Sequence, residues 1–325
     1  MQAKAVRIHA QGGPEVLCVE QVDIAEPSAG EVLVRQTAIG LNYQDIYHRS
    51  GQYPLGFPSG LGTEAAGVVE RVGPGVSGFA TGDRVCYGGG APGACAAWRV
   101  MPANRLVRTP AGVTDEQAAA LLMKGMTVEY LLQRCYPVKA GEAVLFHAAA
   151  GGVGLLAGQW GHHLGARMVG IASGAEKVAL ALRNGYTECI DRSSEDVPAR
   201  LKQASGGKGF PVVYDSVGLA TFEQTLDALA PRGFFVSFGT TTGAPPPIEA
   251  ATLQKRGSLY FTRPTLVTYT AAPEDLQASA AAVFRLVEQG VLTATIAQRY
   301  PIDDIATAHR DLEAGRTSGS TLILP

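Results

Sequence analysis

A glycine-rich stretch that follows an apolar run is the segment most able to do chemistry. Residues 147–154 read HAAAGGVG and come directly after the run VLF at 144–146. Aligned on the dinucleotide pattern G-x-G-x-x-G, Ala149, Gly151 and Gly154 take the three glycine positions. The second glycine lets a pyrophosphate approach the backbone, and the free N–H groups of a following helix bind that anion. The stretch therefore predicts a phosphate-binding turn, in which Ala149 is a departure because its methyl group must fit.

The residues after the next predicted strand indicate which coenzyme binds. A site for NAD places Asp or Glu at the end of that strand to hold the ribose 2′-hydroxyl. Here the strand at 168–172 is followed by Ser173, with Lys177 close behind and no acid at the strand end. Arg192, after a third predicted strand at 189–191, adds a second positive charge and can stack on adenine. This pattern favours NADPH over NADH, and the alternative is that both cations are solvated surface residues.

Zinc chemistry is disfavoured position by position. A zinc alcohol dehydrogenase needs Cys, His and a further Cys or carboxylate as ligands. Residues 39–45 contain no Cys, and Thr63 stands where a Gly-His-Glu motif would have its histidine. No C-x-x-C pair occurs, and the histidines form no ligand-spaced group with cysteines. We therefore expect no catalytic metal, and we expect His147 and Asp215 to be structural groups at strand ends.

The elements that must position these residues fall into two kinds. Short apolar runs at 16–19, 31–34, 66–69 and 84–87 are separated by Gly- and Pro-rich turns, which is typical of an all-β barrel or sandwich. From residue 143 onward, unbroken apolar strands alternate with helical stretches, which predicts a parallel sheet covered on both faces. The expected fold class is therefore α/β, with a β-barrel part and a doubly wound part.

The sequence also predicts where several further helices and strands begin and end. Residues 114–117 (TDEQ) resemble a helix start with a capping box. Helices are expected at 275–289, closed by Gly290, and at 302–312, and a last strand at 321–324. The apolar segment at 258–261 is either an edge strand or a central one.

Composition narrows the class of protein. A chain of 325 residues predicts two domains at about 100–200 residues each. Its 27 Lys and Arg against 29 Asp and Glu leave no basic surplus, so nucleic acid is not expected as the main partner. No run of 18 apolar residues occurs, so no membrane span is expected. No signal peptide is read at the start, and five scattered cysteines fit a reduced, cytoplasmic protein.

Several motifs together resemble one family. The chain is similar to the zinc-independent quinone oxidoreductases of the medium-chain dehydrogenase/reductase superfamily, which include the zeta-crystallins. The motifs that carry the resemblance are residues 12–17 (GGPEVL), Asn42-x-x-Asp45-x-x-x-Arg49-x-Gly51, residues 60–67 (GLGTEAAG), 124–127 (KGMT), 147–154, 213–218 (VYDSVG) and 262–264 (TRP).

The resemblance implies an architecture and an activity. It implies a discontinuous GroES-like catalytic domain at 1–123 and 266–325, and a Rossmann NADPH-binding domain at 124–265 with a cleft between them. It implies transfer of reducing equivalents from NADPH to a quinone without metal, and a homodimer or tetramer. An edge strand at 258–261 would pair across the twofold axis.

The resemblance also implies site residues. The catalytic set would be Asn42, Tyr47, Tyr53 and Thr127, with a hydrogen bond from Tyr47 or Asn42 to the developing phenolate oxygen. The cofactor would contact Asn42, Thr127, Tyr130, Ala150, Gly151, Gly152, Val153, Ser173, Gly174, Lys177, Arg192, Ser216, Phe238, Gly239, Thr240, Phe261, Arg263 and Arg316. Two departures stand out: close relatives have a tyrosine at position 192, and Arg316 is displaced from the family's C-terminal arginine.

Other interpretations stay open from the residues alone. Tyr47 and Tyr53 can instead be packing aromatics of the barrel rim, and Asp45 and Arg49 can simply pair along one helix. The same scaffold can reduce activated double bonds, such as enones or enoyl thioesters. A third reading is a non-enzymatic NADPH-binding protein with a structural or RNA-binding role, as in the zeta-crystallin branch.

Overall fold

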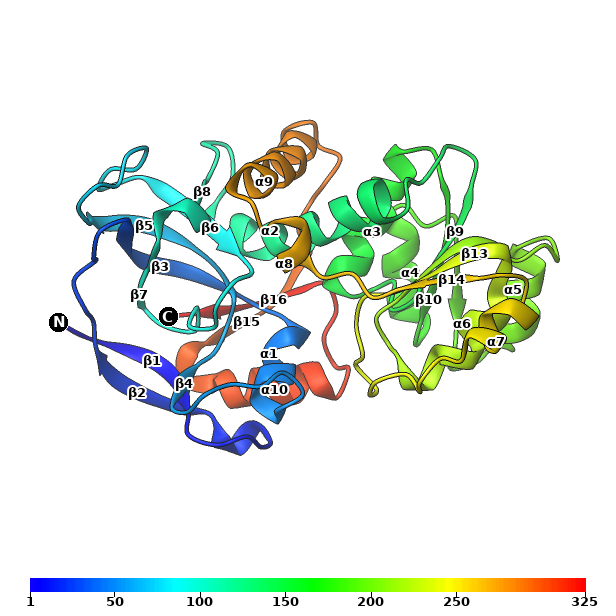
Figure 1. The fold of residues 1–325 in the computed structure, drawn as a ribbon, viewed down its shortest axis with the longest axis horizontal. Coiled ribbons are helices and arrows are strands. Elements are labelled where there is room, and N and C mark those ends of the chain that lie inside the picture. The colour runs from blue at the N-terminus through cyan, green and yellow to red at the C-terminus, as the bar shows by residue number, and fades with distance from the viewer. The chain divides into compact units, whose positions relative to one another are not determined.

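The computed structural model describes every residue, Met1–Pro325, and its contacts divide the chain into two compact units. Unit 1 comprises Met1–Met126, Thr270–Glu288 and Ala294–Pro325, and unit 2 comprises Thr127–Tyr269 and Gln289–Thr293. Figure 1 follows the chain through both units by colour. Each unit has its own sheets and its own core, so each is described by itself.

Unit 1 is built on two sheets. A seven-stranded sheet has the order β15-β16-β3-β5-β6-β8 with β7 paired to β3, and a three-stranded sheet has the order β2-β1-β4. All pairs are antiparallel except β15 with β16. The strands are β1 (Gln2–Ile8), β2 (Cys18–Asp23), β3 (Glu31–Leu41), β4 (Ser59–Gly60), β5 (Glu64–Val72), β6 (Arg84–Gly88), β7 (Trp98–Pro102), β8 (Val107–Arg108), β15 (Ile296–Pro301) and β16 (Ser320–Leu324). The predicted β-rich N-terminal part is confirmed.

The helices of unit 1 follow the predicted caps. They are α1 (Tyr43–Ser50), most of α2 (Asp115–Glu129), α9 (Pro273–Glu288) and α10 (Ile305–Glu313), with short 3-10 turns η1 (Pro14–Val16), η2 (Ala103–Arg105) and η5 (Ile302–Asp304). Gly290 has φ +72°, which confirms the glycine stop after α9. Close packing joins α2 to α9, because a Cβ added at Gly125 would lie 2.7 Å from Val283.

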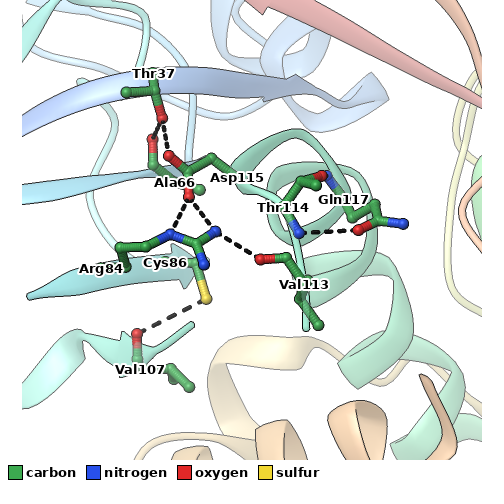
Figure 2. Close-up of polar contacts among 9 residues, drawn as sticks. All are labelled: Thr37, Ala66, Arg84, Cys86, Val107, Val113, Thr114, Asp115 and Gln117. Carbon is green, nitrogen blue, oxygen red and sulfur yellow. Dashed lines mark hydrogen bonds and ion pairs between the residues drawn. The ribbon is translucent and has the colours of Figure 1, made fainter. Parts of the chain in front are cut away.

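Figure 2 shows how the start of α2 is fixed to the sheet of unit 1. The predicted capping box is present, since Gln117 N donates to Thr114 Oγ1 at 3.2 Å and Thr114 N donates to Gln117 Oε1 at 2.9 Å. The Asp115 carboxylate accepts from Thr37 Oγ1 on β3 at 2.7 Å and from Arg84 Nη2 on β6 at 2.6 Å. These contacts hold the helix against β3 and β6, the two strands that flank β5 in the sheet.

Unit 2 contains one fully parallel six-stranded sheet. Its order is β11-β10-β9-β12-β13-β14, which is the doubly wound order 3-2-1-4-5-6. The strands are β9 (Ala143–Phe146), β10 (Arg167–Ala172), β11 (Glu188–Asp191), β12 (Phe210–Asp215), β13 (Leu229–Ser237) and β14 (Tyr260–Thr262). The helical elements are the π-helix η3 (Tyr130–Cys135), α3 (Gly152–His163), α4 (Ala175–Arg183), α5 (Val197–Ala204), the 3-10 turn η4 (Leu219–Thr221), α6 (Phe222–Ala228), α7 (Ala250–Lys255) and α8 (Leu266–Tyr269). The predicted parallel sheet is confirmed.

Helices cover both faces of this sheet. Val169 and Ile171 of β10 join a buried cluster that includes Leu201 of α5 and Phe222 of α6. Met168, which points to the opposite face, lies against α3, since a Cβ added at Gly161 would clash with its side chain. The reversal of strand order between β9 and β12 is the place where such sheets bind ligands at the carboxyl ends of their strands.

The last strand of the sheet has one free edge. β14 pairs only with β13, so the segment at 258–261 contributes an edge strand within the chain. Tyr260 is 54% exposed, and its ring stacks on Phe234 with centroids 4.5 Å apart.

The five cysteines form no disulfide, and only Cys18 is exposed. Burial raises the pKa of Cys86 and of Cys189 to about 12, so both thiols are protonated at neutral pH. No helix has the length and apolar character needed to cross a bilayer.

Candidate functional site

The glycine-rich turn joins β9 to α3 at the point where the sheet reverses its order. Gly151 is the N-cap of α3, and Ala148 has φ +54°, in the left-handed region. The strained position is therefore Ala148, one residue before the expected Ala149. The methyl group of Ala149 fits because β10 has Gly170 opposite, where a Cβ would lie only 2.7 Å from it.

Gly154 and Gly151 have different roles in the turn. A Cβ added at Gly154 would lie 2.4 Å from the Ala148 carbonyl oxygen, so this glycine is needed for the helix to approach the strand. At Gly151 the same carbonyl, at 3.3 Å, is the only protein atom within 4 Å of an added Cβ. The space beside Gly151 is therefore open, and Gly152 and Val153 behind it are partly exposed at the helix N-terminus. This cradle fits the pyrophosphate of a dinucleotide.

A buried hydrogen-bond network lies under the turn. His147 Nε2 contacts Thr225 Oγ1 at 3.0 Å, and this hydroxyl donates to Asp215 Oδ2 at 3.1 Å. Asp215 Oδ1 accepts from the backbone N–H of Val217 at 2.6 Å, which shapes the loop that carries Ser216. Burial lowers the pKa of His147, so its ring is neutral. His147 and Asp215 contact protein groups at strand ends, as expected for structural residues.

Two cations lie close together after β10 and β11. Burial lowers the pKa of Lys177, and the nearby positive charge of Arg192 lowers it further. β10 ends at Ala172 without an acid. Asp191 is turned to the backbone, accepting from Gly174 N at 2.8 Å and from Ser193 Oγ at 2.6 Å. A phosphate placed between Lys177 and Arg192 would relieve their repulsion, so the cluster fits a 2′-phosphorylated coenzyme.

The loops after β12 and β13 pack side by side. A Cβ added at Gly239 would lie 2.7 Å from the carbonyl oxygen of Ser216, so only glycine fits between Phe238 and Thr240. Arg263 Nη1 donates to the Ser237 carbonyl at 2.9 Å. Three expected cofactor residues, Ser216, Gly239 and Thr240, are therefore brought together at the carboxyl ends of neighbouring strands.

The remaining expected residues of unit 2 lie on flanking elements. Tyr130 begins the π-helix η3 and stacks on Tyr269, with ring centroids 4.5 Å apart. Phe261 of β14 packs edge-on against Phe235 at 5.1 Å. Ala150 is buried within the glycine-rich turn, and Thr127 lies in the last turns of α2.

Aromatic residues of unit 1 form a cluster on and beside α1. Tyr47 packs edge-on against Tyr43 at 5.3 Å and against Tyr53 at 5.1 Å between ring centroids. Tyr47 is buried, whereas Tyr43 and Tyr53 are partly exposed. The cluster lies on and beside α1, whose N-cap is Asn42.

Asn42 is held by charged groups that the sequence reasoning did not connect. Its Nδ2 donates to Glu64 Oε2 at 2.9 Å, and Lys124 Nζ donates to the same oxygen at 2.9 Å. Glu64 and Lys124 are both buried. Glu64 and Lys124 lie in the strings GTEAAG and KGMT, which carry the family resemblance, but nothing in a single sequence indicates that the two strings meet.

The expected pairing of Asp45 with Arg49 is wrong. Asp45 Oδ2 accepts from Asn42 N at 2.9 Å, and its Oδ1 has no partner. Arg49 instead binds Glu313 of α10 at 2.5 Å and His309 at 3.2 Å, because its long side chain points away from Asp45 to the neighbouring helix. The ion pair therefore fixes α1 to α10.

Arg316 and Thr63 also have protein partners. Arg316, 60% exposed at its side chain, binds Asp311 through Nε at 2.9 Å and Nη2 at 2.5 Å. Thr63 Oγ1 contacts Met123 Sδ at 3.6 Å. No group of three or more His, Cys, Asp or Glu side chains is arranged to hold a metal ion.

Comparison with known proteins places this geometry in a family. Residues 28–134 match the family described as the alcohol dehydrogenase GroES-like domain, and residues 152–283 match the one described as zinc-binding dehydrogenase. The chain is 49% identical to a quinone oxidoreductase of Pseudomonas aeruginosa over 99% of this chain and 100% of that protein. The chain belongs to the quinone oxidoreductase family of the medium-chain dehydrogenase/reductase superfamily.

Solved structures of this family agree with the fold. The Escherichia coli quinone oxidoreductase complexed with NADPH superposes with a TM-score of 0.97 at 45% identity, over 99% of this chain and 100% of that one. A 2-haloacrylate reductase from a Burkholderia species is 40% identical over 99% of this chain and 98% of that protein. The relatives of this chain therefore include proteins named as quinone oxidoreductases and one named as a 2-haloacrylate reductase.

Proposed function

We propose that this protein is an NADPH-dependent quinone reductase that works without a metal ion. The observation that carries the proposal is the cluster of Lys177 and Arg192 beside a strand that ends without an acid. The cation cluster fits the 2′-phosphate that distinguishes NADPH from NADH, and the open cradle at Gly151 fits the pyrophosphate that both coenzymes share, within a parallel sheet of this order. The quinone oxidoreductase relatives and the NADPH complex of the Escherichia coli protein support it.

When bound, NADPH supplies a hydride from its nicotinamide ring. A quinone is flat and electron-poor, and the charge it gains spreads over an aromatic product, so holding the quinone against the nicotinamide would supply most of the catalysis through positioning. Tyr47 and Tyr53 shape the pocket for that ring. No side chain of the site has to act as an obligatory general acid, because water can protonate the product.

We assign the roles of the other residues in the same way. Unit 2 binds the coenzyme through the loops that carry Gly151, Ser173, Ser216 and Gly239. Unit 1 supplies Asn42 and the tyrosine cluster, and Thr127 completes the catalytic set. A homodimer or tetramer and a cytoplasmic location belong to the proposal as well. The free edge of β14 supports pairing of two copies, and five unpaired cysteines fit a reducing compartment.

A substrate panel tests the proposed activity. NADPH oxidation is followed with benzoquinones and naphthoquinones in one arm and with enones and a haloacrylate in the other. We expect kcat/KM to be at least about tenfold higher for the best quinone than for any activated alkene. Faster turnover of the alkenes would replace the proposal with the second candidate.

The second candidate, a reductase of activated double bonds, rests on the 2-haloacrylate reductase relative. That reaction must protonate a carbon atom, which requires a placed acid. A non-enzymatic NADPH-binding role, structural or RNA-binding, would show coenzyme binding with no turnover in either arm. The net charge of −2 is unfavourable for RNA as the partner.

A further inference from the structure

The buried Glu64 carboxylate is saturated by three donors within unit 1. Its Oε1 accepts from Met123 N at 2.6 Å, and its Oε2 accepts from Lys124 Nζ and Asn42 Nδ2, both at 2.9 Å. Glu64 is 0% and Lys124 5% exposed. A buried ion pair of this kind seldom adds net stability over apolar residues, so a role in specifying structure is the better explanation for keeping it.

The pair determines which way the Asn42 amide faces. A carboxylate only accepts hydrogen bonds, so the atom that Asn42 turns to Glu64 must be its NH2 group. The second hydrogen of that group points to the Gly40 carbonyl oxygen at 3.3 Å. Both donors of Asn42 are therefore used inside unit 1.

The amide oxygen is the group that remains. Asn42 is partly exposed at the start of α1, where it forms a capping box with Asp45. A carbonyl oxygen has two lone pairs, so Oδ1 keeps acceptor capacity even beside the first N–H groups of the helix. Asn42 can therefore receive a hydrogen bond from a ligand, but it has no N–H left to donate to one.

We infer that Glu64 and Lys124 are positioning residues that lock Asn42 as a hydrogen-bond acceptor for an N–H or O–H group in the nicotinamide half of the coenzyme. This inference rests on the proposed function, and it replaces the sequence-based expectation that Asn42 donates to the phenolate oxygen. The donor is either the carboxamide N–H or a hydroxyl of the nicotinamide ribose.

The negative charge of Glu64 is what restricts the Asn42 amide to one orientation. An amide in its place could donate as well as accept, and Asn42 could then turn over and present its NH2 group. Lys124 is required because an unpaired buried carboxylate would be strongly destabilising. Replacing both charges together, as Glu64→Gln/Lys124→Met, removes the lock while it keeps the volume and leaves no buried charge unpaired.

The first test measures NADPH binding by fluorescence titration, with thermal unfolding without coenzyme as the folding control. We expect Glu64→Gln/Lys124→Met to bind NADPH about tenfold more weakly, the effect of one lost hydrogen bond, while it unfolds within a few degrees of the unsubstituted chain. Binding equal to the unsubstituted chain would overturn the inference.

A sign reversal separates positioning from a merely structural role. Asn42→Asp alone sets a carboxylate against Glu64 and should weaken NADPH binding. In the Glu64→Gln/Lys124→Met background the introduced amide can donate to the new carboxylate, which presents an acceptor whichever way it turns. We therefore expect Asn42→Asp to improve binding in that background to within about threefold of the unsubstituted chain. Equal damage in both backgrounds would contradict the inference.

Coenzyme analogues identify the donor. The loss caused by Asn42→Ala should disappear with the 3-acetylpyridine analogue if the carboxamide N–H is the donor, and with a deoxyribose analogue of the nicotinamide half if a hydroxyl is. An equal loss with every analogue would overturn the inference. An unsubstituted chain that binds NADPH but reduces no quinone would defeat the proposed function alone, because these tests measure binding.

Discussion

The surroundings of Lys177 and Arg192 are the basis for proposing that they bind the 2′-phosphate. The pKa of Lys177 is lowered by burial and by the neighbouring guanidinium, so the protein holds two cations where they repel each other. Asp191, at the end of the adjoining strand β11, accepts hydrogen bonds from N–H and O–H donors, which lower its pKa to about 2. An anion bound beside both cations would therefore be attracted by two positive charges.

Removing either cation should therefore change the coenzyme preference. We expect Lys177→Ala and Arg192→Ala each to weaken NADPH binding by about 10- to 100-fold, because a charge-assisted hydrogen bond is lost, while NADH binding stays within about twofold. Titration of both coenzymes measures this. Arg183→Ala, an exposed cation on the same helix as Lys177, is the matched control and should bind NADPH normally. A parallel loss for NADH would show that the cations do not contact the 2′-phosphate.

Asp45 is a buried carboxyl group that makes the stability of the fold depend on pH. Burial raises its pKa to about 7 against an ordinary value of 3.8. The folded state then holds a proton that the unfolded state releases, so the contribution of Asp45 to stability is complete below pH 4 and is lost as pH rises to about 7.

This pH dependence can be isolated with one substitution. We expect the free energy of unfolding to fall by up to about 4 kcal/mol between pH 4 and pH 8 because of Asp45, from three pKa units at 1.36 kcal/mol each. In Asp45→Asn that component should be absent, since an amide does not titrate. Urea unfolding at several pH values measures the difference between the two chains. Parallel curves for the two chains would mean that Asp45 is ionised in the folded protein.

At the scale of elements, the turn between β9 and α3 separates packing from binding. An added Cβ at Gly154 meets backbone at 2.4 Å, whereas at Gly151 it meets only one protein atom, at 3.3 Å. Gly154→Ala should therefore destabilise unit 2 by about 1–3 kcal/mol, as overpacking does. Gly151→Ala should unfold normally and yet bind NADPH at least about tenfold more weakly. Thermal unfolding and coenzyme titration of both variants test this, and unimpaired binding by Gly151→Ala would place the pyrophosphate elsewhere.

Elements could be predicted where local chemistry decides them. The capping box at Thr114, the glycine stop at Gly290 and the apolar strands of unit 2 are all set by neighbours in the sequence. The left-handed residue of the turn could not be predicted, because Ala148 stands in a run of three alanines, and the fit of its neighbour Ala149 depends on Gly170 in the next strand. The partners of Arg49 could not be predicted either, since Glu313 and His309 come from the other end of the chain.

For the molecule as a whole, the two-part architecture follows from a change of hydrophobic period along the chain. The parallel sheet of unit 2 could be predicted from the strand–helix alternation, and its doubly wound class from the family resemblance. The contact of Asn42 with a buried ion pair could not be predicted from the sequence, because Glu64 and Lys124 are 60 residues apart and meet only in the folded unit. Long-range polar contacts of this kind have no local signature. The residues of the candidate site could therefore be predicted from the sequence, but the direction of the hydrogen bonds made by Asn42 could not.

Metal-free transfer from NADPH to a quinone is the central claim, and one measurement tests it most directly. The purified chain is treated with a strong chelator, its metal content is determined, and the rate of naphthoquinone reduction is measured with NADPH and with NADH. We predict full turnover at far less than one metal ion per chain, with NADPH preferred over NADH by at least about tenfold. Loss of activity on chelation that added zinc restores, or faster turnover with NADH, would contradict the account.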